Sequence, residues 1–191
     1  MKKRVLSLFM AFVLCLTLLP TSAFAAGGTG TARSGASGNV AKVGDTEYGT
    51  LQEILEEMNE VEITLLGDVE EELTVYAATT INMAGFSIIG DIDAADSLTL
   101  KNGTVKGNVK VDGGTFTMTA PANAEAAIDG GLNVVSGSCD ISGAKVGVKG
   151  SLTFGGDTMT ITGTEKAVEL TAAAEPASKA IYGAATVDGN T

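Results

Sequence analysis

Short apolar triplets with a polar central residue recur from Val61 almost to the C-terminus. A first series advances in steps of 18, 17, 18, 16 and 20 residues, and its members begin at Ile63, Ile81, Leu98, Phe116, Leu132 and Leu152. A second series lies between them and begins at Leu73, Val109, Cys139 and Met159. Alternation within a triplet predicts a strand with one buried face, and a nearly fixed period predicts a solenoid. We therefore expect an all-β parallel β-helix in which the first series stacks in one sheet.

The outer residues of each triplet are the expected core, because alternate side chains of a strand share a face. Those predicted to point inward are Ile63, Leu65, Ile81, Met83, Leu98, Leu100, Phe116, Met118, Leu132 and Val134. Turn signals such as Asn102-Gly103 and Asp112-Gly113-Gly114 separate the strands. An antiparallel sandwich with hairpins would also need such turns, so it remains the alternative fold. The period near 18 residues favours the parallel β-helix.

One short α-helix is predicted ahead of the repeats, from Leu51 to Asn59. Thr50-x-x-Glu53 has the form of a capping box. An apolar stripe follows at helical spacing and consists of Leu51, Ile54, Leu55 and Met58. The open end of a solenoid exposes unpaired backbone and apolar side chains, so it needs a cap. We expect residues 39–60 to form a strand and this capping helix, and residues 61–191 to form the rungs, truncated at the C-terminus if the protein is longer.

The first 25 residues have the pattern of a secretory signal peptide. The basic start, KKR, precedes an apolar run from Val5 to Leu19 and an A-x-A cleavage pattern at Ala23-Phe24-Ala25. That run is shorter than the roughly 20 residues of a transmembrane helix, and Phe12-Val13-Leu14 does not resemble the approach to a lipoprotein cysteine at Cys15. We expect residues 26–38 to be a flexible leader. The protein is then secreted, extracellular or at the cell surface, without membrane insertion after cleavage.

Three motifs between Val43 and Gly114 carry a resemblance to secreted bacterial surface proteins. They read Tyr48-Gly49-Thr50-Leu51-Gln52-Glu53-Ile54, Ile63-Thr64-Leu65-Leu66-Gly67-Asp68-Val69 and Leu98-Thr99-Leu100-Lys101-Asn102-Gly103-Thr104-Val105-Lys106-Gly107. This stretch resembles the capped start of a right-handed, pectate-lyase-like parallel β-helix in secreted Gram-positive surface proteins. Beyond it, only the general rung pattern continues. The resemblance implies a fold and a setting, because function depends on sites carried by the scaffold.

The charge of the chain excludes several classes of partner. With 23 acidic and 12 basic residues the net charge is −11, and removal of the KKR start leaves nine basic residues and a net charge of −14. Such a surface repels nucleic acid, anionic lipid and acidic polysaccharide. The chain has no His, which excludes His-based catalysis and metal ligation. Arg33 is the only Arg outside the signal segment, and Lys101, Lys106 and Lys110 are interpreted as ordinary exposed positions.

One candidate metal site is present, the D-x-D-x-x-D run of Asp91, Asp93 and Asp96. Carboxylates bind Ca²⁺, but the spacing departs from the EF-hand pattern and Asp is also common in turns. A Ca²⁺ site and a simple turn therefore both remain open, and no other cofactor is expected. Cys139 is the one cysteine outside the signal segment, so no intramolecular disulfide forms, and we expect it to be a small buried apolar residue.

Two threonine-rich strands, Thr115–Thr119 and Thr158–Thr162, alternate Thr outward with apolar residues inward. Flat Thr arrays resemble ice-binding solenoids, but about two rungs without the same motif separate these stretches. Since β-branched Thr suits any exposed strand, we interpret them as ordinary outer faces.

The predicted function is a non-enzymatic secreted or cell-surface module that is structural, adhesive or in contact with carbohydrate. Its partner would be extracellular polysaccharide or a cell-wall or host surface, and not nucleic acid. The alternative is the N-terminal fragment of a polysaccharide lyase or glycoside hydrolase with catalytic rungs beyond residue 191. We assign no catalytic residues, because the acidic residues concentrate on the helix, at Glu70-Glu71-Glu72 and at turns instead of pairing across a cleft.

Overall fold

Parallel β-strands dominate the computed structural model, which describes residues 38–59, 61–171 and 184–188. The chain divides into two units, Met1–Ala36 and Ser37–Thr191, and all described residues belong to the second. This unit is a β-solenoid of about 5 turns, as the repeat pattern predicts. The expected signal peptide, residues 1–25, lies outside the described residues, and so does the expected leader apart from its last residue, Gly38.

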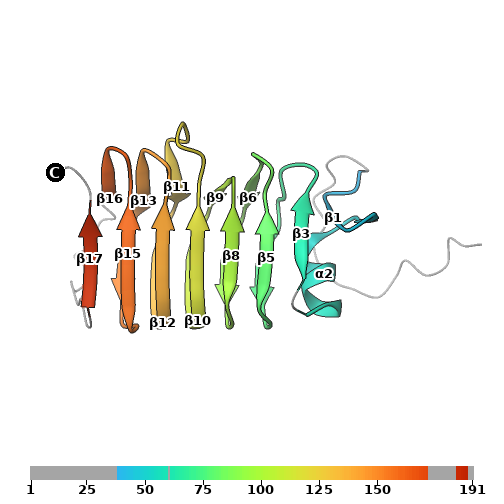
Figure 1. Cartoon of the computed structure of the whole chain (residues 1–191), viewed down its shortest axis with the longest axis horizontal. Coiled ribbons are helices and arrows are strands. Elements are labelled where there is room, and N and C mark those ends of the chain that lie inside the picture. Colours follow the sequence, from blue (N-terminus) through green and yellow to red (C-terminus); the bar gives the residue numbers. More distant parts are fainter. Residues whose placement is uncertain (1–37, 60, 172–183, 189–191) are drawn as a thin grey trace, which may run out of the picture. The chain divides into compact units, whose positions relative to one another are not determined.

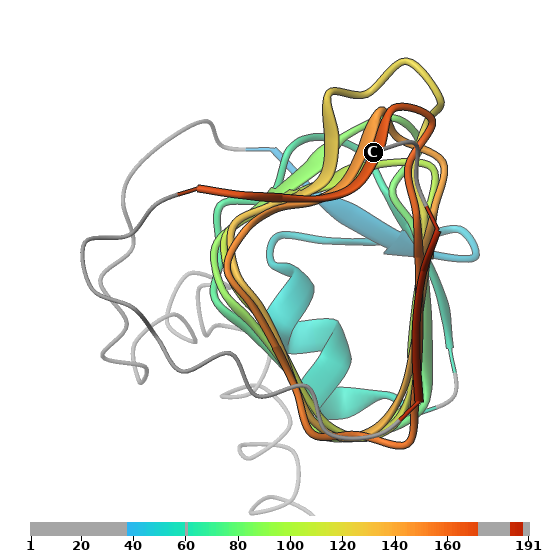
Figure 2. The ribbon, with the colours of Figure 1, turned by 90° about the vertical axis from the view of Figure 1, so that its left-hand side faces the viewer.

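Each turn of the solenoid visits three parallel sheets in a fixed order, the first, the third and then the second. The first sheet, whose strands lie side by side in Figure 1, contains β3 (Glu62–Leu65), β5 (Thr79–Asn82), β8 (Leu98–Lys101), the second halves of β10 (Val109–Thr119) and β12 (Leu132–Ser142), β15 (Thr158–Thr162) and β17 (Ala184–Asp188). The second contains β4 (Leu73–Val75), β7 (Ile92–Ala94), the first halves of β10 and β12, and β14 (Leu152–Phe154). The third contains β6 (Ser87–Ile89), β9 (Thr104–Lys106), β11 (Ala126–Asp129), β13 (Val146–Gly150) and β16 (Lys166–Leu170). Figure 2 shows the turns superimposed when viewed along the stack, with the first sheet as the straight side that includes β17.

The pairings exclude the antiparallel sandwich. Successive turns pair in parallel in every sheet, from β3 with β5 to β15 with β17. Among the described strands, antiparallel pairs occur only at the N-terminal end, where β1 (Ala41–Val43) pairs with β2 (Thr46–Tyr48) and with β3. The parallel β-helix predicted from the period of the apolar triplets is therefore confirmed.

The predicted grouping of the triplets into sheets is wrong after Phe116. Phe116 pairs with Leu98 on one side and with Cys139 on the other, whereas Leu132 pairs with Leu152 in the second sheet. The turn that follows Phe116 is longer than its predecessors, and its extra length includes the loop that protrudes before β11 in Figure 2. A step of 16 residues from Phe116 therefore stops short of a full turn and reaches a strand of the second sheet.

The core fills the inside of the turns. All ten side chains predicted to point inward are buried, with no more than 1% of their surface exposed. The apolar residues of the second series, including Leu73 and Met159, join the same continuous cluster. Because alternation depends only on the strand, the inward direction was predictable even where the sheet was assigned wrongly.

Helix α2 (Leu51–Glu57) begins at Thr50, whose Oγ1 accepts a hydrogen bond from the Glu53 N–H at 3.4 Å. The Glu71 carboxylate, which belongs to the first turn, accepts from the N–H groups of the first two helical residues at 3.1 and 3.0 Å. Free N–H groups and partial positive charge at a helix N-terminus favour such a carboxylate. These hydrogen bonds of Glu71 join the N-terminus of the helix to the solenoid. The helix ends at Glu57 instead of the expected Asn59.

The end of the solenoid is covered by this helix and by the β1–β2 hairpin. The buried residues of α2 are Leu51, Ile54 and Leu55. Gln52, on the side of the helix expected to face solvent, pairs its amide with the backbone of β4. The Thr74 N–H donates to Gln52 Oε1 at 2.9 Å, and Gln52 Nε2 donates to the Thr74 carbonyl at 3.5 Å. A side-chain amide thus satisfies backbone groups that the edge of a sheet would otherwise leave free.

A column of glycines follows the corner between the third and second sheets, at Gly90, Gly107, Gly130 and Gly150. The backbones of successive turns approach closely there. A Cβ atom on Gly107, Gly130 or Gly150 would overlap the carbonyl oxygen of the preceding glycine in the column. This corner therefore requires residues without a side chain.

Candidate binding groove on the second sheet

The three aspartates of the candidate metal site contact three different groups. The Asp91 carboxylate accepts from the Asn108 N–H at 2.8 Å, while Asp96 accepts from the neighbouring Ser97 N–H at 2.6 Å. Asp93 lies on β7 and forms an ion pair with Lys110. Within the part of the chain that the structure describes, no group of three acidic or Cys side chains is arranged to hold a metal ion. The structure therefore does not bring these three residues together.

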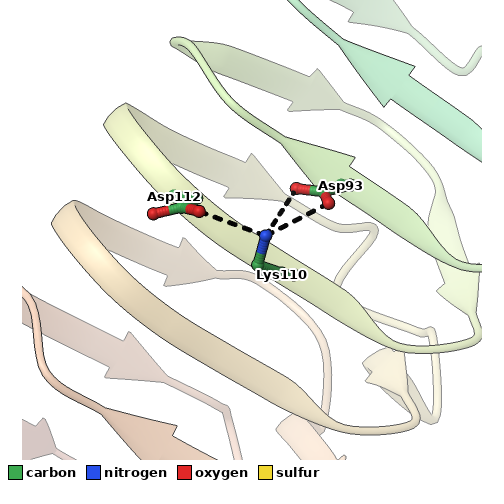
Figure 3. Close-up of polar contacts among 3 residues, drawn as sticks. All are labelled: Asp93, Lys110 and Asp112. Atoms are coloured by element: carbon green, nitrogen blue, oxygen red, sulfur yellow. Dashed lines mark hydrogen bonds and ion pairs between the residues drawn. The ribbon is translucent and has the colours of Figure 1, made fainter.

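Lys110 lies at the centre of a small charged cluster that Figure 3 shows. Its Nζ is 3.2 Å from Asp93 Oδ2 on the preceding turn and 3.1 Å from Asp112 Oδ2 on its own strand. The hydrogen bonds to Asp112 and Asp93 raise the pKa of Lys110 above its ordinary value of 10.5. All three side chains remain accessible, with exposed fractions of 42–45%. The cluster therefore presents an oriented cation between two carboxylates at the surface.

This cluster belongs to a column of outward side chains on the second sheet. Register places Thr74, Asp93, Lys110, Asn133 and Thr153 opposite one another on successive turns. Strands in a sheet are about 4.8 Å apart, so the column offers polar groups at that interval. Each position alternates with buried apolar neighbours, which fixes its outward direction.

A second polar column lies beside the first, at the corner of the sheet. Asn108 is its central residue and bridges two turns. Its Nδ2 donates to Asp91 at 3.1 Å, and its Oδ1 accepts from the Gly131 N–H at 2.9 Å. The column also includes Ser151, next to β14. Together the two columns line a shallow groove of about 520 Å³ on the outer side of the second sheet.

The groove offers hydrogen-bond donors and acceptors in alternation. Amides and hydroxyls both donate and accept, carboxylates accept, and a lysine ammonium donates. None of the described residues that line the groove is aromatic. Such a surface can bind a hydroxyl-rich ligand through several weak contacts along the stack.

Sequence reasoning did not single out Lys110. The structure separates it from Lys101, on the first sheet, and from Lys106, on the third. The signal that the sequence offers is the number of residues between Asp93 and Lys110, which corresponds to one turn of the solenoid. Opposite charges at the rung interval predict a cross-strand pair, provided that the turn is counted correctly.

Cys139 lies inside the solenoid, where its strand pairs with those of Phe116 and Met159. Its side chain is buried, and burial raises the pKa of the thiol to about 12, with a smaller contribution from Asp140. The interpretation as a small buried apolar residue agrees with this environment.

Cys139 should not react with a thiol-specific disulfide reagent in the native protein at pH 8, because the thiolate is the reactive form. Complete labelling of Cys139 is expected after unfolding in urea. Rapid labelling of Cys139 in the native protein, distinguished from Cys15 by peptide mapping, would contradict the buried position. The raised pKa also has a thermodynamic consequence. Above pH 9 the unfolded chain loses this proton first, so the free energy of unfolding should fall as the pH rises from 9 toward 12.

Comparison with protein-family models, with curated proteins and with solved structures gives no match to this chain. Among the helices in the described ranges, none has the length and apolar character needed to cross a membrane.

Proposed function

We propose that this protein is a non-enzymatic module, secreted or attached to the cell surface, whose second sheet binds uncharged extracellular carbohydrate. The observation that carries the proposal is Lys110, oriented by Asp93 and Asp112 beside a groove that is lined by two columns of polar side chains. Two of the three ammonium donors are directed to these carboxylates, which leaves a donor for a ligand hydroxyl. The β-solenoid provides the rigid support that such a surface requires.

The charge distribution supports an uncharged ligand. Among the described residues that line the groove, Glu72, Asp91 and Asp93 are acidic and Lys110 is the one cation. The whole chain has a net charge of −11. A polyanion such as pectate would be repelled by this field, whereas neutral sugar hydroxyls can donate to the carboxylates.

The chemistry of the groove supports binding instead of catalysis. Its single lysine has a raised pKa, so at neutral pH it is a cation and not a general base. The chain contains no His, and its two Arg residues, Arg4 and Arg33, precede the solenoid. We propose on these grounds that the groove orients a glycan without transforming it.

Calorimetric titration with cello-, xylo- and manno-oligosaccharides tests the proposal. At least one of them should bind, and Lys110→Gln should weaken that binding by about tenfold, the loss expected for a hydrogen bond to a charged group. Lys106→Gln, on the third sheet, is the matched control and should bind like the wild type. Reducing ends should not accumulate in the same mixtures.

The proposal fails if no oligosaccharide binds, or if the two lysine variants bind equally well. Turnover that survives repurification and disappears in the Lys110 variant would show that the groove is catalytic.

A further inference from the structure

The outer side of the first sheet carries a regular array of hydroxyl groups, here called the hydroxyl face. It is formed by the outward residues of three adjacent strands, β10, β12 and β15. They are Thr115, Thr117, Thr119, Ser138, Asp140, Ser142, Thr158, Thr160 and Thr162. Every one of these residues is exposed or half-buried, while the residues between them are buried.

Register turns these residues into columns along the stack. Thr115, Ser138 and Thr158 are opposite one another, and Thr119 is opposite Ser142. Strand spacing is about 4.8 Å and alternate residues of a strand are roughly 6.6 Å apart, so the hydroxyls form a two-dimensional grid. The two Thr-rich strands are separated by one rung and not by two, and that rung carries Ser in two of its three outward positions. The three strands therefore form one contiguous outer face.

The hydroxyl face differs in charge from the rest of the surface. Asp140 is its one charged residue, in a chain with a net charge of −11. Thr158 donates to Ser138 at 2.9 Å, which aligns two neighbouring hydroxyls of one column. Hydroxyls both donate and accept, so a matching partner must present groups that do both, at a regular interval.

Three kinds of partner present such groups, and the face discriminates among them. A second copy of the chain would bring together two molecules that each carry a net charge of −11, and like charges repel each other. A layer of ordered water consists of molecules that each donate and accept hydrogen bonds, and the carboxylate of Asp140, which only accepts, interrupts that pattern. Sugar hydroxyls donate to a carboxylate in a charge-assisted hydrogen bond. We infer that the hydroxyl face binds the surface of an ordered, uncharged polysaccharide, at a site separate from the groove of the second sheet.

Depletion of the full-length protein by microcrystalline cellulose and by chitin particles tests this inference. The wild type should be retained by at least one solid. Thr115→Val together with Thr119→Val keeps β-branched side chains of similar size and removes two hydroxyls, so retention should weaken by about tenfold. Thr104→Val with Thr164→Val is the matched control, because both residues lie off the first sheet, and its retention should not change. Circular dichroism should give the same melting temperature for the two double variants within a few degrees.

Binding to the solid is separable from binding in the groove. Lys110→Gln should be retained on the particles like the wild type, whatever its affinity for soluble oligosaccharides. The inference is overturned if neither solid retains the protein, if the Thr115 and Thr119 double variant is retained like the wild type, or if Lys110→Gln alone abolishes retention. Incorporation into growing ice without retention on either polysaccharide would also overturn it.

Discussion

Gly130→Ala should destabilise the solenoid by about 3 kcal/mol or more, near the upper end of the usual cost of overpacking. The new methyl group would overlap the carbonyl oxygen of Gly107 on the preceding turn. That oxygen belongs to the backbone of a neighbouring rung, so it can move only if the hydrogen bonds of the corner move with it. The Gly130 N–H donates to the Lys149 carbonyl at 2.9 Å, which ties the same corner to the following turn. Thermal unfolding should give a melting temperature lower by roughly 10 °C.

Gly67→Ala is the control for this prediction. A Cβ atom at Gly67 meets nothing within 4 Å, and its backbone is not in the left-handed region. Its melting temperature should stay within about 2 °C of the wild type. A similar loss in both variants would mean that the glycine column is not closely packed.

Leu55→Asp should have an effect of comparable size, about 4 kcal/mol, by removing the apolar cover of the first turn. Leu55 is 4% exposed and belongs to the continuous core. The substitution loses buried apolar area, which costs 2–5 kcal/mol for comparable truncations, and it places a carboxylate in a site without a partner. Urea unfolding should show a lower midpoint for this variant.

Glu57→Asp introduces the same side chain two residues later on an exposed position of α2. Its midpoint should differ little from that of the wild type, since exposed substitutions usually change stability by less than about 0.5 kcal/mol. A wild-type midpoint for Leu55→Asp would show that the helix does not contribute to the stability of the solenoid.

The helix also shows where sequence reasoning stops. Its start at Thr50 and its buried stripe follow from residue types at local spacings, so they were predictable. The contacts of Glu71 with the helix N-terminus and of Gln52 with β4 join residues about 20 positions apart in the chain. No local pattern distinguishes these two side chains from the other polar residues near them.

The candidate sites depend on a similar step from pattern to register. Asp93 was singled out as part of an acidic run, but the structure gives it a different partner, Lys110 on the next turn. The spacing of the triplets places the Thr-rich strands about two rungs apart, whereas the structure leaves a single rung between them. In both cases the sequence identifies the residues themselves but not the residues that lie opposite them on the neighbouring strand.

Alternation and period are the two properties that the amino-acid sequence by itself determined. Alternation settles which side chains point inward, because successive residues of any strand face opposite sides. The period favours strands that stack in parallel turns, and the observed pairings exclude the antiparallel alternative. Which triplets share a sheet was decided only in the tertiary structure, because an apolar triplet looks the same on each of three faces. The longer turn between Phe116 and Cys139 moved every later triplet relative to the count, and packing between turns, not local sequence, determined where each outward side chain lies.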